Sequence, residues 1–444
     1  MRSALLPIHK REGSDVDEAS LLGIQRRISA QLHLHRLLVT PVHRLPSELL
    51  SEVFLHYHDA LVNTRDELDI LFKIEFTIVC VCSSWRAAAY GTPQLWTRLT
   101  SPPAKMFLES YVHRFLPLSG TLPIHLNSRS ADGMLHPFLL LLRSHAFRWE
   151  SACFRGRTSD LKDFGPVDVP LLQRLDLELT EEGYADMKEP LRFLKTAPQL
   201  RHVSFRAPAM SSYLSLRPAS ALTSLRVNIA VSRTQVIILA LQELADTLED
   251  LEFSVFSDLS VNHAPSTLPV ELPKLERMRL LNRSCAALDF ITPPRIECLT
   301  LDGPNKKVPG ALLRCLVREP QVAAGLRRLD LRGRDIIRNV RNLEDLISCF
   351  ERLTGLRELS FAHPPPLAIL EVLHVREDAR PLLPSLRDAN FKTTRETVEA
   401  YMNFRKSRAE ERMVRGVHVV ALNHTAADDP RECLRVSSTQ RLTL

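Results

Sequence analysis

The stretches LRRLDL at residues 326–331 and LRELSF at residues 356–361 share one spacing of apolar side chains. An apolar leader is followed three and five positions later by further apolar residues, with polar residues between them. In a β-strand, neighbouring side chains point to opposite faces. Because apolar and polar residues alternate here, each stretch is predicted to form a short strand with one buried face. The leaders of nine such stretches are Leu172, Leu200, Leu222, Leu248, Leu275, Ile296, Leu326, Leu356 and Leu386.

Successive leaders lie 21 to 30 residues apart, and segments with helical periodicity, such as 232–248 and 339–353, fill the intervals. A looser copy begins at Trp149. The pattern resembles leucine-rich repeats, whose period is about 20–29 residues. The position eight after each leader never carries the Asn or Cys usual in that family, so the repeats are degenerate. The resemblance implies an α/β fold, with an irregular solenoid over residues 145–425 that has parallel strands on its concave face and helices on its convex face.

A second pattern precedes the repeats. It reads LPSELLSEVF at residues 45–54, VCSSWR at 81–86 and PQLW at 93–96. Pro46 suits the start of a helix because its missing N–H needs no partner there. A further helix is predicted from about Glu67 to Ala89. The three pieces, in this order, closely resemble the F-box, a small all-α domain, over residues 41–100, although the connection between the first two pieces is longer than the family usually has.

The F-box resemblance implies docking on the Skp-type adaptor of a cullin–RING ubiquitin ligase. An apolar helix face is expected to enter a groove of the adaptor, with Val81 and Trp85 packing behind it and Trp85 near the edge of the interface. The residues expected to bind the adaptor are Leu45, Pro46, Leu49, Leu50, Phe54, Val81 and Trp85.

The segments outside these two regions have weaker signals. Residues 18–40 are predicted to form an amphipathic helix that packs on the next domain, with a short coiled coil as the less favoured alternative. Its apolar face holds Leu21, Ile24, Ile28 and Leu32 at helical spacing. The remaining expected segments are a disordered tail at 1–17, a linker or first irregular repeat at 101–144, and a C-terminal tail at 426–444.

Composition argues against an enzyme. Only 14 of 444 residues are Gly, and no glycine-rich phosphate-binding motif occurs. Nucleophile elbows and metal-protease or EF-hand motifs are also missing from the sequence. The eight Cys are scattered without a C-x-x-C pair, and Cys80 and Cys82 are expected to be small apolar residues within a helix rather than metal ligands. We therefore expect a non-catalytic protein with no cofactor and no metal.

The predicted strands also define a candidate ligand face. Side chains two, four and six positions after each leader point away from the core, and in the nine repeats eight of these are basic and eight acidic. A balanced face argues against binding to a phosphate backbone and favours a protein ligand, although a hydrated face without a ligand is an equal alternative. The residues expected to bind the substrate are Arg277, Arg279, Arg328 and Arg332. One hypothesis is a phosphorylated degron, because Arg suits bidentate contacts with phosphate.

The predicted function is that of a substrate-receptor subunit of an SCF-type ubiquitin ligase. A ligase-independent F-box scaffold is the alternative, and nucleic-acid binding through the net charge of +6 is less favoured. Residues 1–15 lack the pattern of a signal peptide. No apolar run approaches the roughly 20 residues of a membrane span. We therefore expect an intracellular protein without membrane contact, in the cytoplasm, the nucleus or both.

Overall fold

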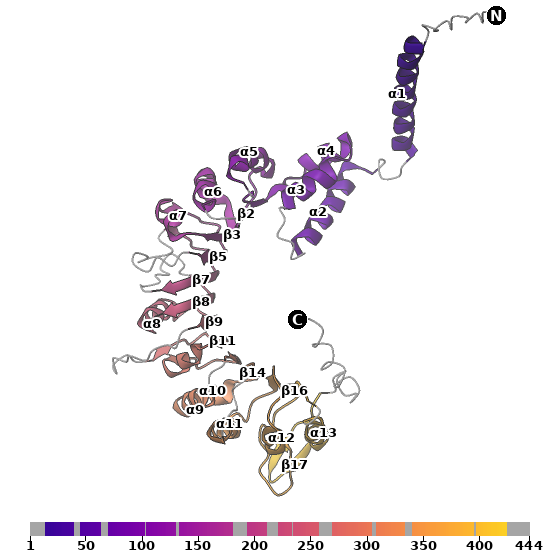
Figure 1. The fold of residues 1–444 in the computed structure, drawn as a ribbon. Coiled ribbons are helices and arrows are strands. Elements are labelled where there is room, and N and C mark those ends of the chain that lie inside the picture. Colours follow the sequence, from indigo (N-terminus) through magenta and orange to yellow (C-terminus); the bar gives the residue numbers. More distant parts are fainter. Residues whose placement is uncertain are drawn as a thin grey trace, which may run out of the picture. The chain divides into compact units, whose positions relative to one another are not determined.

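The computed structural model contains two compact units, described separately here. Unit 1 comprises Met1–Arg98 and Arg114–Leu122, and unit 2 comprises Leu99–His113 and Pro123–Leu444. Both lie within a mixed α/β chain (Figure 1). The residues described are 14–39, 45–63, 70–102, 104–129, 133–180, 193–210, 221–232, 234–256, 269–303, 308–333, 340–394 and 397–423.

Unit 1 is built from helices. In chain order they are α1 (Ser14–Val39), α2 (Ser47–Asn63), α3 (Ile70–Ile74), the π-helical η2 (Glu75–Val79), α4 (Ser83–Tyr90), η3 (Pro93–Trp96) and η5 (Leu116–Ser119), while α5 (Leu108–Phe115) crosses the boundary between the units. The core gathers around Trp96, which is fully buried. Its indole Nε1 donates to the carbonyl of Ala89 over 2.8 Å, and its ring stacks on Phe115.

The prediction of one helix from Glu67 to Ala89 is wrong. The helical path ends with η2, and a turn at residues 80–82 separates it from α4. Cys82 has an extended backbone, with φ −160° and ψ 174°. No Gly or Pro marks this break, so the sequence offered no signal for it. The expectation that Cys80 and Cys82 pack inside a helix is also wrong, because Cys80 is exposed and Cys82 half-buried in the turn.

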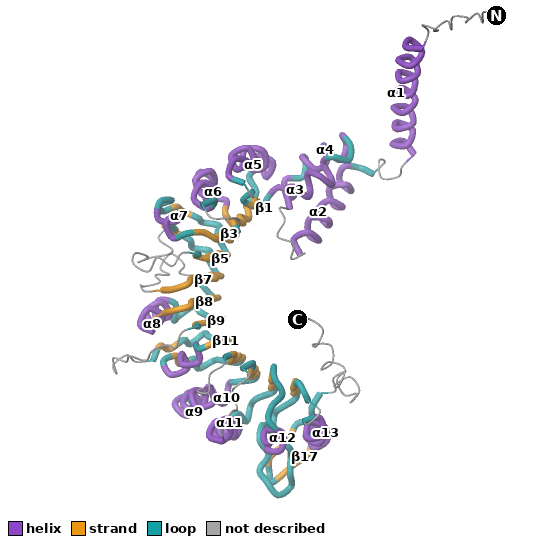
Figure 2. Tube along the Cα trace, in the orientation of Figure 1, coloured by secondary structure: helices purple, strands orange, loops and turns teal. Residues whose placement is uncertain are grey.

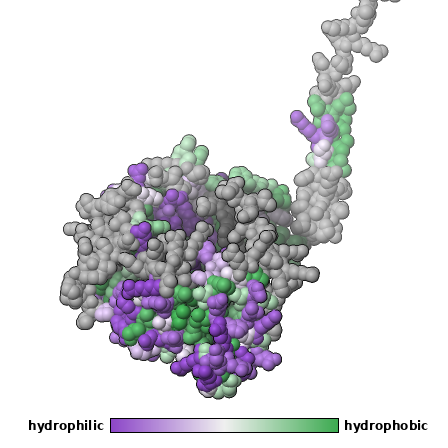
Figure 3. Space-filling view, turned by 60° about the horizontal axis from the view of Figure 1, so that its bottom comes forward, coloured by the Kyte–Doolittle hydropathy of each residue, from purple (hydrophilic) through white to green (hydrophobic). Residues whose placement is uncertain are grey.

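The predicted N-terminal helix is confirmed as α1, but its expected packing is not. Leu21, Ile24, Ile28 and Leu32 are between 50% and 63% exposed, and every side chain from residue 20 to 32 is exposed. Figure 3 shows apolar side chains along one side of this helix with no described segment over them. Helical spacing identifies an apolar face, but it does not determine whether the same chain covers that face.

A 12-stranded sheet dominates unit 2. Its strand order is β1-β2-β3-β5-β7-β8-β9-β11-β13-β14-β15-β16, and every neighbouring pair from β2 to β16 is parallel. The bounds of these strands are Arg98–Thr100, Ile124–Ser128, Trp149–Gly156, Arg174–Leu179, His202–Met210, Ser224–Ser232, Asp250–Val255, Arg277–Asn282, Cys298–Asp302, Arg328–Leu331, Glu358–Phe361 and Asp388–Phe391. Since β1 and β2 belong to it, the sheet reaches upstream of residue 145.

Helical segments and short strands connect the strands of the long sheet. The helices are η4 (Lys105–Phe107), α6 (Leu135–Leu142), η6 (Arg143–Arg148), α7 (Thr158–Lys162), α8 (Thr234–Glu243), η7 (Ser284–Asp289), α9 (Val308–Arg318), α10 (Pro320–Gly325), α11 (Val340–Arg352), α12 (Leu367–Leu373) and α13 (Val398–Ser407). The short strands are β4 (Val167–Asp168), β6 (Leu194–Thr196), β10 (Val270–Glu271), β12 (Ile291–Thr292), β17 (Arg412–Val414) and β18 (Val417–Val419). Within unit 2 the helices follow one side of the sheet and the strands line the other (Figures 1 and 2).

The nine predicted strands and their parallel arrangement are confirmed. All nine predicted leaders are fully buried, as is Trp149 in the earlier copy. The pairing joins equivalent positions of successive repeats, so that Leu329 lies between Leu299 and Leu359. The buried side of the sheet is therefore a set of aligned apolar rows, and the polar rows face the other way. The helices predicted at 232–248 and 339–353 are found as α8 and α11.

Candidate binding surfaces

The helix α2 carries the first candidate surface. Its first turn is set by Pro46, whose carbonyl accepts the amide of Leu50 over 3.1 Å. The hydroxyl of Ser51 donates to the carbonyl of Ser47 and accepts a hydrogen bond from Thr92, 2.7 Å away in the turn that follows α4. The bond from Thr92 ties α2 to the turn after α4, and the rotation of α2 against its neighbours decides which of its apolar side chains face outward.

The predicted adaptor-binding residues divide between the core and the surface. Leu50 and Phe54 are 3% and 1% exposed and belong to the core of unit 1. The prediction that Leu50 and Phe54 contact a partner is therefore wrong, because their side chains are buried within unit 1 itself. Leu49 is 51% exposed and Leu45 is 36% exposed, and Pro46 is exposed as well. These three residues remain available at a surface.

The exposed side of α2 continues beyond the predicted set. Val53 and Tyr57 follow Leu49 at intervals of four residues, and they are 52% and 36% exposed. Side chains four positions apart lie one above the other on a helix. Leu49, Val53 and Tyr57 therefore form a continuous strip on α2. Together with the exposed Leu45 just before the helix, we call them the α2 ridge. The spacing of Val53 and Tyr57 was visible in the sequence, but their orientation depended on which face the core occupied.

The segment after α2 contributes further apolar exposure. Phe76 in η2 is 71% exposed, and the neighbouring Thr77 hydroxyl lies 3.5 Å from the Tyr57 hydroxyl at the end of the ridge. Val81 is 50% exposed in the turn before α4, so it does not pack behind α2 as expected. Trp85 does pack there and is half-buried. Sequence reasoning missed Phe76 because it lies in the long connection of the F-box-like pattern.

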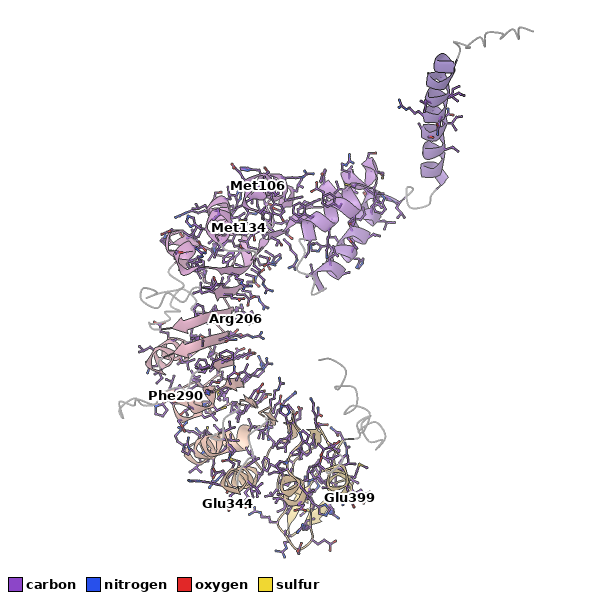
Figure 4. All side chains as sticks on the ribbon, in the orientation of Figure 1. Met106, Met134, Arg206, Phe290, Glu344 and Glu399 are labelled. Atoms are coloured by element: carbon purple, nitrogen blue, oxygen red, sulfur yellow. The ribbon has the colours of Figure 1, made fainter. Side chains whose placement is uncertain are left out.

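The polar face of the large sheet is the second candidate surface, and it holds the four predicted substrate-binding arginines. In Figure 4 the strand residue Arg206 marks this side, whereas Glu344 and Glu399 lie with the helices. All four predicted arginines are exposed on this face, and each lies near a carboxylate. The closest pairs are Arg277–Asp250 at 3.4 Å, Arg279–Glu252 at 3.3 Å, Arg328–Glu358 at 3.3 Å and Arg332–Asp330 at 2.7 Å.

These ion pairs change the electrostatic character of the predicted residues. The Nε atom of Arg332 donates a hydrogen bond to Asp330, a residue whose side chain is only 6% exposed. Arg277 likewise donates to Asp250. Arg277, Arg328 and Arg332, each beside a carboxylate, have little net charge left for a ligand. Arg279 differs from them, because it shares Glu252 with Arg226. The structure brings the four residues to one face, as predicted, but it does not gather them into a cluster of uncompensated positive charge.

The thiols of the chain differ in their titration. Burial raises the pKa of Cys285 to about 12 and that of Cys315 to about 11. At Cys82, burial opposes ionisation, but hydrogen bonds from the Ser84 hydroxyl and the backbone amides of Ser84 and Trp85 outweigh it and lower the pKa. Among the described residues, no group of three or more His, Cys, Asp or Glu side chains is placed to hold a metal ion.

Comparisons with known proteins add no family name. A scan against protein-family models finds no match for the chain, and a search of curated proteins finds no matching sequence. In the described part of the chain, none of the helices is long and apolar enough to cross a membrane.

Proposed function

We propose that this chain is the substrate-receptor subunit of a cullin–RING ubiquitin ligase of the SCF type. One observation carries the proposal. The segment that resembles the start of the F-box presents Leu45, Leu49 and Val53 outward, while Leu50 and Phe54 anchor the same helix from behind. Exposed apolar side chains that recur along a rigid helix are typical of a site where another protein binds.

In this proposal the α2 ridge enters a groove of the Skp-type adaptor. Burial of a side chain such as Leu49 removes apolar surface from water, at about 25 cal/mol per Å². The anchoring by Leu50 and Phe54 keeps α2 in one orientation, so little conformational entropy is lost on binding. The described part of Unit 1 thus needs no rearrangement to present the ridge.

The large sheet would act as the substrate-binding part, an irregular leucine-rich-repeat solenoid. The parallel strands in chain order, with equivalent positions aligned, support this assignment. The chain itself would carry out no bond chemistry. It would accelerate ubiquitin transfer by holding substrate and conjugating enzyme close together, which replaces a bimolecular encounter by a local one.

Co-purification from cells tests this proposal. The tagged chain is expected to retain the Skp-type adaptor and, through it, the cullin. Partners that accumulate when the chain is removed would identify substrates. A folded chain that retains no adaptor contradicts the proposal, while adaptor binding without any stabilised partner would favour the ligase-independent scaffold.

A further inference from the structure

Two arginines on the sheet face share a single carboxylate. Arg155, Glu178 and Arg206 lie on β3, β5 and β7, and the parallel pairing places them side by side in one row. The Nε atom of Arg155 lies 3.6 Å from one carboxylate oxygen of Glu178, and the Nη1 atom of Arg206 lies 3.6 Å from the other. Both arginine side chains are more than half exposed. We call this arrangement the first triad.

The same arrangement recurs further along the sheet. Arg226, Glu252 and Arg279 lie on β8, β9 and β11, again in one row. The carboxylate oxygen Oε2 of Glu252 lies 3.7 Å from Arg226 and 3.3 Å from Arg279. This second triad has the same order of charges as the first. Both triads place one carboxylate between two guanidinium groups on neighbouring strands.

Within its own row, each triad has two guanidinium groups for one carboxylate. In the row next to the second triad, Arg277 is shared by Asp250 and Glu276. Guanidinium groups are always protonated, so two of them beside one ionised carboxylate leave a net charge of about +1. Arg155, Arg206 and Arg226 make no side-chain hydrogen bond to the described residues, because their ion contacts exceed hydrogen-bonding distance. Arg332, by contrast, is hydrogen-bonded to its own Asp330. The triads therefore keep donors available to a ligand.

We propose that the two triads bind an extended acidic peptide segment, with one carboxylate side chain of the ligand at each triad. The residual charge of each triad matches one carboxylate. Guanidinium groups on both sides offer the forked donors that suit a carboxylate. Glu178 and Glu252 show how an anion is held at these positions, since each already sits between two arginines.

The separation of the triads sets the spacing of the acidic residues. Glu178 and Glu252 are three strand steps apart, since β7 and β8 lie between their strands. At about 4.8 Å per step, with an offset of two residues along the strands, this is roughly 16 Å. An extended peptide advances about 3.3 Å per residue. Two Asp or Glu side chains about four to five positions apart would reach both triads.

This inference names the substrate class for the proposed receptor and to that extent rests on the proposed function. Its test needs no adaptor. Blocked polar peptides with two Glu residues, placed at varied separations, are titrated into the full chain at low ionic strength, and binding is followed by fluorescence anisotropy. Binding should be tightest at a separation of about four to five positions and should weaken by about fivefold or more when Gln replaces both Glu residues.

Variants of the chain locate the binding site. Arg155→Gln and Arg206→Gln should each weaken binding several-fold, by roughly three- to tenfold. Glu178→Gln should strengthen it by a similar factor, because the ligand carboxylate then meets no competitor. Arg328→Gln is the matched control, since Arg328 is equally exposed and holds its own carboxylate. It should change the affinity by less than about twofold.

Three results would overturn the inference. They are equal affinity for Glu and Gln peptides, a loss with Arg328→Gln as large as that with Arg155→Gln, and weaker binding by Glu178→Gln. A chain that binds the acidic peptide but no adaptor would leave this surface intact and refute the receptor function. A chain that binds the adaptor but binds Glu and Gln peptides equally would support the receptor function and refute the acidic-peptide site.

Discussion

The ring of Phe54 packs against the indole of Trp85, with centroids 5.1 Å apart and ring planes inclined by 58°. This contact joins α2 to α4. Phe54 is 1% exposed, whereas its neighbour Val53 is 52% exposed. Two adjacent apolar residues of one motif thus face opposite ways, one into the core of unit 1 and one into solvent. Stability and partner binding should therefore respond to different substitutions.

Phe54→Ala is expected to destabilise unit 1 by about 3–5 kcal/mol, because it removes a large buried ring and leaves a cavity. Val53→Ala, the matched control on the same helix, should change stability by less than about 0.5 kcal/mol, since its side chain is already half in water. Denaturant unfolding followed by tryptophan fluorescence compares the two. Equal losses for both variants would contradict the assigned orientation of α2.

His58 makes the stability of unit 1 depend on pH. Burial, the largest effect, lowers its pKa, as does Arg98, against the opposing influence of Asp59. Its Nε2 atom is buried and has no hydrogen-bond partner among the described residues. The unfolded chain binds the proton more readily, so this contribution to stability is complete above the unfolded pKa of about 6.5 and is lost as the pH falls below it.

We therefore expect the unfolding midpoint of unit 1 to fall between about pH 7 and pH 5, and to fall less in a His58→Gln variant. Denaturant titrations at several pH values measure how steeply the unfolding midpoint changes with pH in the natural chain and in the variant. Parallel slopes in the two proteins would show that His58 is not the group responsible.

Thiol labelling should separate the cysteines into two classes. Cys80 is exposed and the pKa of Cys82 is lowered by its hydrogen bonds, so both should react with iodoacetamide at neutral pH. Cys285 and Cys315 should react only after unfolding, since burial raises their pKa values to about 12 and about 11. Mass spectrometry of the labelled peptides gives the order. Early labelling of Cys285 would contradict its place in the core.

The sheet was the most predictable part of the fold. A period-two pattern assigns each strand residue to a face, and repeats of similar length bring equivalent positions into register. The pairs Arg277–Cys298 and Cys298–Arg328 follow directly from this rule. The buried leaders and outward arginines were therefore predictable, although the sequence left open whether residues 101–144 are a linker or the first irregular repeat.

The candidate sites were less predictable, for two physical reasons. On α2, the residues at 49 and 53 and those at 50 and 54 form two adjacent apolar strips, and only packing decides which strip becomes core. On the sheet, ion pairing depends on side-chain reach between strands. Arg277 and Arg155 look alike in the sequence, yet Arg277 has Asp250 as its nearest acid while Arg155 shares Glu178 with Arg206.

The most direct measurement of the central claim is the dissociation constant between the full chain and a purified Skp-type adaptor. Leu49→Ser should weaken binding by about tenfold or more, because a side chain expected at the centre of the interface becomes polar. Val317→Ser is the control, since Val317 on α9 is 52% exposed but lies in unit 2. It should leave the constant within about twofold. No binding by the unaltered chain, or equal binding by all three proteins, would contradict docking through the α2 ridge.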